Sequence, residues 1–208
     1  AATFKSVGGC TRVPLAFDPY DSIFVVFRKA SSGSRGNGPN RPTWQQTLSI
    51  SGPWQVAFDA RWGGPEKPVR FDSLTDWTEN KDPRIKFYSG KAVYRTTFRL
   101  EHEPGGKPVA IALGQVEDVG IARVALNGTD LGVVWRPPFV VGVSQAVQSG
   151  ENELEVMVVN SWRNRLIGDR ELPATERLTR TNIAVTKDWK LERSGLLGPV
   201  VLMTKKTP

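Results

Sequence analysis

The chain has 208 residues, of which 39% are hydrophobic and 24% are charged, so it is long enough to bury the core of one large domain. Its single cysteine, Cys10, excludes an internal disulfide and a zinc site made of cysteines, and its single histidine, His102, excludes a multi-histidine metal site. No stretch approaches the roughly 20 apolar residues of a membrane-spanning helix, so no membrane partner is expected. The chain opens on Ala1 without an initiator methionine or an apolar signal-peptide region, and we expect it to be a mature or excised part of a longer protein.

The net charge of +7 raises the question of an acidic polymer as partner. Between Trp162 and Arg193, however, eight basic residues are interleaved with five acidic ones. A surface that binds a phosphate backbone would have fewer acidic residues among its basic ones. The sequence also has no Lys/Arg run and no helix-turn-helix pattern. We therefore do not expect nucleic acid as a partner.

Residues 1–42 are predicted to be a leading segment followed by a linker. Its apolar run Ser22–Arg28 has the length of a strand and lacks alternation, which is typical of a strand buried on both faces. Because a lone strand is not stable, we expect it to pair with the main domain or with a domain upstream. Residues 31–42 are rich in glycine, serine and proline and cannot bury a core.

Residues 43–208 carry short strand patterns at regular spacing. Apolar and polar residues alternate with period two in Leu48–Ser51, Trp54–Phe58 and Tyr94–Leu100, which is typical of half-buried antiparallel strands and puts Trp54 in the core. Further strand-like runs follow at residues 109–113, 119–126, 139–141, 154–159 and 198–203. No window of a dozen residues has a helical period, although 144–147 is compatible with a single turn. The sequence predicts an all-β fold, an antiparallel β-sandwich.

The strongest local signal is the pair Asn127-Gly128 between two apolar stretches. Both residues tolerate the positive φ angles of a type I′ turn, so the pattern predicts a β-hairpin, and Asn127 is explained by this geometry. The second strand of the hairpin ends in Trp135 and Arg136, followed by two prolines.

Proteins hold sugars by stacking an aromatic ring on the apolar face of the sugar and by bonding its hydroxyls with Arg, Asn and carboxylate side chains. Trp135-Arg136 supplies this combination where a strand meets a loop, and so does Trp162-Arg163-Asn164-Arg165. We expect Asn160–Asp169 to leave a sheet rim as a surface-lining segment. The candidate ligand-binding residues are Trp135, Arg136, Trp162, Arg163, Asn164, Arg165, Asp169 and, at the mouth of a polar loop, Trp77.

The structural alternative is that Trp135 and Trp162 cap the core while the arginines pair with Asp169 or Glu171. Catalysis by the chain itself is not expected. Adjacent Glu117 and Asp118 would point to opposite faces of a strand, and arginines around Asp169 would keep it ionised, whereas a general acid needs a raised pKa. No cofactor is expected; such sandwiches can hold structural calcium, but no dense carboxylate cluster is visible.

Several short motifs, taken in order, resemble the sugar-binding β-sandwich of glycoside hydrolase family 2: Gly52–Val56, Leu74–Trp77, Phe87–Arg95, Leu113–Val116, Val124–Gly128 and Gly150–Leu154. A second set is more specifically similar to the C-terminal region of family 106 α-L-rhamnosidases: Asn160–Asp169, Leu172-Pro173 and Ser194–Val200. The leading segment Asp21–Phe27 resembles the exit from the domain that precedes this region.

This resemblance implies a galactose-binding-like jelly roll in an accessory position, whose catalytic barrel lies upstream in the same polypeptide. It also implies a plant or algal polysaccharide or oligosaccharide as partner and a periplasmic or extracellular location. It does not transfer catalysis to this chain. The two readings that remain are a carbohydrate-binding module and a purely structural domain that supports an α-L-rhamnosidase-like barrel.

Overall fold

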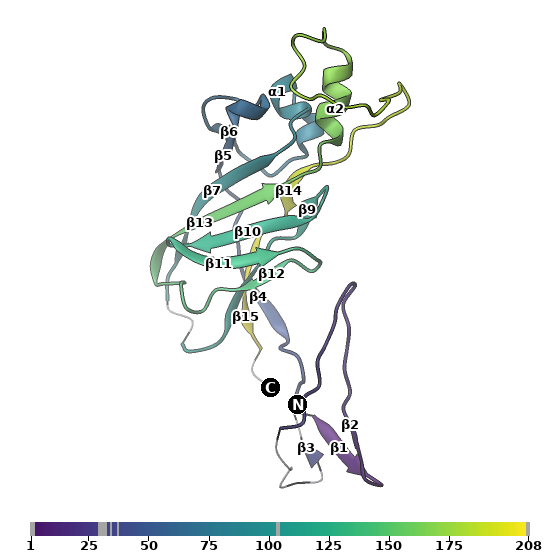
Figure 1. The fold of residues 1–208 in the computed structure, drawn as a ribbon. Coiled ribbons are helices and arrows are strands. Elements are labelled where there is room, and N and C mark those ends of the chain that lie inside the picture. Colours follow the sequence, from purple (N-terminus) through teal and green to yellow (C-terminus); the bar gives the residue numbers. More distant parts are fainter. Residues whose placement is uncertain (1–2, 29–32, 34, 37, 103–104, 207–208) are drawn as a thin grey trace.

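The protein is described by a computed structural model that covers residues 3–28, 33, 35–36, 38–102 and 105–206 (Figure 1). Its larger sheet has the order β11 (Thr129–Val134), β10 (Ile121–Leu126), β13 (Gly150–Val159), β7 (Lys91–Leu100), β5 (Trp54–Phe58) and β6 (Val69–Phe71). The smaller sheet has the order β12 (Val140–Gly142), β8 (Val109–Ala112), β15 (Val201–Lys205) and β4 (Trp44–Ser49), and a short pair joins β14 (Gly195–Gly198) to β9 (Gln115–Glu117). The neighbouring strands run antiparallel, which confirms the predicted β-sandwich.

The core lies between the two sheets because alternate residues of each strand face inward. On β13, for example, Leu154, Val156 and Val158 are fully buried while the intervening side chains face outward. Trp54 is also fully buried and meets the ring of Tyr94 edge-on, with the ring centroids 6.2 Å apart, as its alternation predicted. Burial raises the pKa of Tyr94 above its ordinary value, so this hydroxyl stays neutral inside the core.

The Asn127-Gly128 turn joins β10 to β11 with φ angles of 51° and 76°, which confirms the predicted hairpin. The Asn127 side chain does more than tolerate this conformation. Its Nδ2 donates to the Ala146 carbonyl at 2.8 Å and to Asn152 Oδ1 at 2.9 Å, and its Oδ1 accepts from the Glu153 N–H at 2.8 Å. The turn is therefore fastened to the neighbouring loop and strand.

We expect Asn127→Ala to lower the free energy of unfolding by about 2–4 kcal/mol. Alanine tolerates left-handed backbone angles less well than asparagine, because it has no polar side chain to bond the backbone nearby. The substitution also leaves buried polar groups without hydrogen-bond partners. Asn127→Gly is the matched control, since it keeps the backbone freedom and loses only the side-chain bonds. Urea unfolding should therefore place Asn127→Gly between the wild type and Asn127→Ala. Equal stability of the two variants would show that the turn conformation contributes nothing.

Residues before β4 form a separate small sheet of β1 (Phe4–Val7), β2 (Cys10–Arg12) and β3 (Arg35–Gly36), which lies at the opposite end of the molecule from α2 (Arg163–Arg170) (Figure 1). The predicted pairing of Ser22–Arg28 with the main domain was wrong, whereas its pairing with a domain upstream stays a prediction. No strand pairs with this run among the described residues, and Phe24 and Phe27 are 91% and 73% exposed. An apolar run alone cannot reveal whether a strand edge is available to it. Residues 31, 32, 34 and 37 of the predicted linker lie outside the described residues.

In the described ranges, four short helical segments interrupt the strands: η1 (Ala60–Trp62), η2 (Trp77–Glu79), α1 (Pro83–Lys86) and α2. The expectation that Asn160–Asp169 forms a surface-lining loop was therefore wrong, because most of it is helix α2. This helix has eight residues, too few for a periodicity over a dozen. Its buried face includes Asn164, Arg165 and Asp169, so no apolar stripe marks it in the sequence.

The first and last strands of the sandwich are neighbours. In the register of β4 with β15, Trp44 lies opposite Lys205, and the Lys206 N–H donates to the Thr43 carbonyl at 2.8 Å. Both ends of the sandwich therefore leave the fold side by side (Figure 1). None of the helices in the described part of the chain has the length and apolar character required to cross a membrane.

Candidate functional site

Strand register brings Trp135 and Trp162 to the same end of the larger sheet. Trp135 follows β11 and Trp162 follows β13, and the strand between them, β10, begins there, with Ile121 opposite Val159 and Ala122 opposite Val134. Neighbouring strands are about 4.8 Å apart, so the two strand ends are separated by about 10 Å. We call this end the rim, defined by Trp135, Val119–Ile121 and Trp162.

The rim exposes apolar surface. Trp135 is 64% and Trp162 is 59% exposed, and between them Val119 and Ile121 are 45% and 37% exposed. The loop before β10 is held to the end of β13 by a hydrogen bond from the Ser161 N–H to Asp118 Oδ2 at 2.9 Å. Because both indoles are more than half exposed, the alternative prediction that Trp135 and Trp162 cap the core is wrong.

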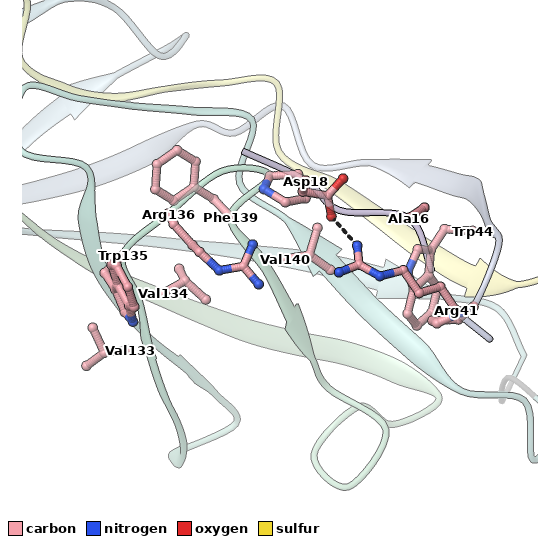
Figure 2. Close-up of a pocket in the computed structure, with 12 residues that line it drawn as sticks. Ala16, Asp18, Arg41, Trp44, Val133, Val134, Trp135, Arg136, Phe139 and Val140 are labelled. Atoms are coloured by element: carbon pink, nitrogen blue, oxygen red, sulfur yellow. Dashed lines mark hydrogen bonds and ion pairs between the residues drawn. The ribbon is translucent and has the colours of Figure 1, made fainter. Parts of the chain in front are cut away.

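Two hollows flank Trp135. The first, of about 580 Å³, lies between the leading segment and the sandwich and is lined by Asp18, Arg41, Trp44, Trp135 and Phe139, among others (Figure 2). The second, of about 750 Å³, is lined on its other side by Tyr20, Glu117 and Asp118. The exposed indole of Trp135 thus stands between two concave surfaces.

Arg136 is engaged within the protein. Its Nη2 lies 2.7 Å from Asp21 Oδ1, and its Nη1 donates to the Pro137 carbonyl at 3.1 Å. The other oxygen of Asp21 pairs with Arg41, whose Nη1 also lies 2.6 Å from Asp18 Oδ2. The Asp21 side chain is 3% exposed. Arg136 therefore fastens the leading segment to the sandwich, a contact that we call the Asp21 clamp. The guanidinium of Arg136, which was predicted to bind a sugar hydroxyl, is occupied by this clamp.

Trp77 lies in the core, so its predicted place at the mouth of a cleft was wrong. It is fully buried, its Nε1–H donates to Tyr94 Oη at 2.6 Å, and its ring packs edge-on against Phe58 and Tyr88 at centroid distances of 5.3 and 5.7 Å. The backbone N–H of Trp77 also donates to the Ser194 carbonyl. The polar loop that follows Trp77 in the sequence gives no sign of this inward turn.

Helix α2 turns three predicted ligand-binding residues into the protein. Asn164 Nδ2 donates to the Glu192 carbonyl at 2.7 Å, and its Oδ1 accepts from the Glu192 N–H at 2.9 Å. Arg165 Nε lies 3.1 Å from Asp169 Oδ1, and their side chains are 10% and 3% exposed. Burial lowers the pKa of Arg165, and the charge of Asp169 opposes this effect. Asn164, Arg165 and Asp169 are thus not available to a ligand, and the predicted pairing of an arginine with Asp169 is confirmed.

Arg163 is also engaged. Its guanidinium lies over the ring of Trp189, 4.7 Å from the centroid, and its Nε donates to the Lys190 carbonyl at 2.9 Å and lies 3.2 Å from Glu192 Oε1. Of the predicted residues, Trp135 and Trp162 alone present their side chains openly. Sequence reasoning missed Tyr20 and the Asp21 clamp, since no local signal joins residues 115 positions apart. The described residues contain no group of three or more His, Cys, Asp or Glu side chains placed to hold a metal ion.

Comparison with known proteins agrees with this architecture. No family model matches the sequence. A rhamnosidase from Novosphingobium sp. PP1Y superimposes with a TM-score of 0.88 and 35% identity, over 98% of this chain and 19% of the rhamnosidase chain. The chain resembles one region of a glycoside hydrolase. This confirms the resemblance to rhamnosidases that the sequence motifs indicated.

Other relatives are glucuronidases by name. A putative β-glucuronidase of Formosa agariphila is 37% identical over 151 residues, 72% of this chain and 13% of that protein. A β-D-glucuronidase of Dictyoglomus thermophilum, 18% identical with a TM-score of 0.53 over 81% of this chain and 29% of the other, shows the fold alone. The chain spans less than a third of each of these proteins, which is consistent with a non-catalytic domain.

Proposed function

We propose that this chain is an accessory, non-catalytic domain of a larger glycoside hydrolase and that it holds a polysaccharide or oligosaccharide at the rim. The observation that carries the proposal is the exposure of two indoles, Trp135 and Trp162, at one end of one sheet. Exposed indoles are the side chains best suited to stack on the apolar face of a sugar ring. The hollows beside Trp135 give such a ring a concave surface with the carboxylates Glu117 and Asp118 beside it.

The partner within the same polypeptide is proposed to be a catalytic domain. The rhamnosidase match favours an α-L-rhamnosidase-like reaction for the parent enzyme, because that superposition includes nearly the whole chain. The name of the Formosa agariphila relative favours a glucuronide as the second candidate substrate of the parent enzyme. A periplasmic or extracellular location is proposed as well, since large polysaccharides are encountered outside the cytoplasm.

Affinity electrophoresis in gels that contain plant or algal polysaccharides tests the proposal. A site with two exposed indoles should bind weakly, near a millimolar dissociation constant or about 4 kcal/mol. We expect Trp135→Ala and Trp162→Ala each to weaken binding about tenfold or more, and to change the free energy of unfolding by less than about 0.5 kcal/mol because neither ring is in the core. Phe24→Ala removes an even more exposed ring from the leading segment and should leave binding unchanged.

If no polysaccharide retards the wild type, the carbohydrate-binding role is rejected. A loss of binding in Phe24→Ala equal to that in the tryptophan variants would place the site elsewhere.

The second candidate function is a purely structural one, in which the domain supports the catalytic barrel of an α-L-rhamnosidase-like enzyme. The row of exposed apolar side chains on the leading segment favours it: Phe17, Tyr20, Phe24, Val26 and Phe27. Large exposed apolar side chains gathered along one segment are typical of protein–protein contacts. Hydrogen exchange of the full natural polypeptide distinguishes the two functions, because support of a barrel requires protection of residues 17–27 there relative to the isolated chain.

A further inference from the structure

The segment between α2 and β14, residues 171–194, contains neither helix nor strand, yet it is fastened to α2 at defined points. Asp169 Oδ2 accepts from the Thr179 N–H at 2.7 Å and from its hydroxyl at 2.6 Å. Arg170 Nη1 donates to the Thr186 carbonyl at 2.6 Å. Long irregular segments in compact domains commonly carry function. We call residues 179–186, which run between these two points, the arch.

A hollow of about 440 Å³ lies between the arch and the C-terminal half of α2. One part of its wall is apolar and includes Leu166, Ile183 and Val185. The other part is basic and includes Arg170, Arg177 and Arg180, together with the hydroxyl-bearing Thr179 and Thr181. Asp169 is the single acidic residue in the lining, and Arg165 pairs with it from within the protein.

The basic side chains of this hollow are unequally engaged. Arg170 is bound to Glu171 and to the Thr186 carbonyl, so it belongs to the wall. Arg177 donates through Nε to the Leu172 carbonyl at 3.0 Å, which leaves its two terminal nitrogens without a partner in the described part of the chain. Arg180 has no hydrogen bond or ion pair with any described residue. Two positive charges are therefore available to a ligand.

We propose that this hollow binds an anionic group on a carbohydrate, either a uronate carboxylate or a sulfate ester. Guanidinium groups present paired N–H donors that match the oxygens of both anions, and the apolar wall suits the C–H face of the sugar ring that carries them. That the anion is part of a carbohydrate rests on the proposed function; the anion site itself rests on the arginines. An extended basic stripe is missing from the lining, so the site fits one anionic group rather than a phosphate backbone.

The hollow is separate from the rim. Trp162 precedes α2 and Asp169 lies near its C-terminal end, so seven residues or about 10 Å of helix lie between the two. The two regions can thus be altered independently.

The test is a titration of the 208-residue chain with sodium glucuronate, glucose 6-sulfate, inorganic sulfate and glucose, followed by the amide NMR signals of the arch. We expect at least one anionic sugar to shift these signals and glucose to leave them unchanged. Arg177→Gln combined with Arg180→Gln should weaken that binding at least tenfold, and raised salt should weaken it in the wild type as well. Both side chains are exposed, so the double variant should fold normally. Arg12→Gln, an exposed arginine on β2, is the matched control and should bind as the wild type does.

Three outcomes overturn the proposal: no shift with either anionic sugar, equal shifts with glucose, or undiminished binding by the double variant. Binding of inorganic sulfate as tightly as of both anionic sugars would mean an adventitious ion only and would overturn the carbohydrate assignment. The preferred sugar identifies the anion, carboxylate or sulfate ester. Trp162→Ala should leave the NMR response of the arch to anionic sugars unchanged. If this variant loses binding of neutral polysaccharide but keeps that response, the rim and the hollow are separate sites, and failure of the rim proposal does not affect the anion site.

Discussion

Trp77→Ala is expected to lower the free energy of unfolding by about 3–5 kcal/mol, as truncation of a buried tryptophan does. The indole packs edge-on against Phe58 and Tyr88, and its N–H donates a hydrogen bond to the buried hydroxyl of Tyr94. Removal of the ring leaves a cavity in the centre of the sandwich and takes one partner from that hydroxyl. Urea unfolding followed by far-ultraviolet circular dichroism measures the loss.

Two comparisons make this result specific. Trp77→Phe keeps an aromatic ring and loses the N–H, so its destabilisation should be smaller than that of alanine. Trp162→Ala removes an indole that is 59% exposed and should change the stability by less than about 0.5 kcal/mol. Equal stability losses for Trp77→Ala and Trp162→Ala would contradict the assignment of one indole to the core and the other to the surface.

Asp169→Ala is expected to cost about 3–5 kcal/mol, because it leaves the guanidinium of Arg165 buried without its counter-charge. It also removes both hydrogen bonds that hold Thr179, and hence one end of the arch. Limited proteolysis should therefore cut residues 171–194 faster in the variant than in the wild type, in addition to the lower midpoint in urea.

The matched control is Glu171→Ala, two residues further along. Its carboxylate pairs with Arg170 at 2.5 Å, but its side chain is 66% exposed, so the pair should contribute no more than about 1 kcal/mol. A cost for Asp169→Ala as small as for Glu171→Ala would show that the buried pair is not a structural element of the domain.

The strands of the sandwich follow directly from the sequence. Strand β7 alternates between an inward and an outward face over Tyr94–Leu100, and Asn127-Gly128 determines the turn between β10 and β11. Period-two patterning and turn chemistry are local properties, so they can be read without the tertiary structure. The Ser22–Arg28 run shows the limit of this approach, because strand formation also depends on a free edge elsewhere in the fold.

The candidate site was predicted less well than the fold, for a related reason. Residues such as Arg165 and Asp169 have the types that bind sugars at a surface, and the same types form buried ion pairs. Which use applies depends on burial, and here burial results from an eight-residue helix without an apolar stripe. The convergence of Trp135 and Trp162 depends on strand order, which local patterns do not provide.

The pairing of β4 with β15 has a consequence for protein engineering. Because Thr43 and Lys206 are joined by a backbone hydrogen bond, the stretch between them can be grafted into a surface hairpin of an unrelated host protein without stretching either junction. Such a chimaera would display the two indoles of the rim and the hollow beside the arch on a scaffold chosen for its solubility. The insertion would need a single site in the host, because the two ends of the insert lie next to each other.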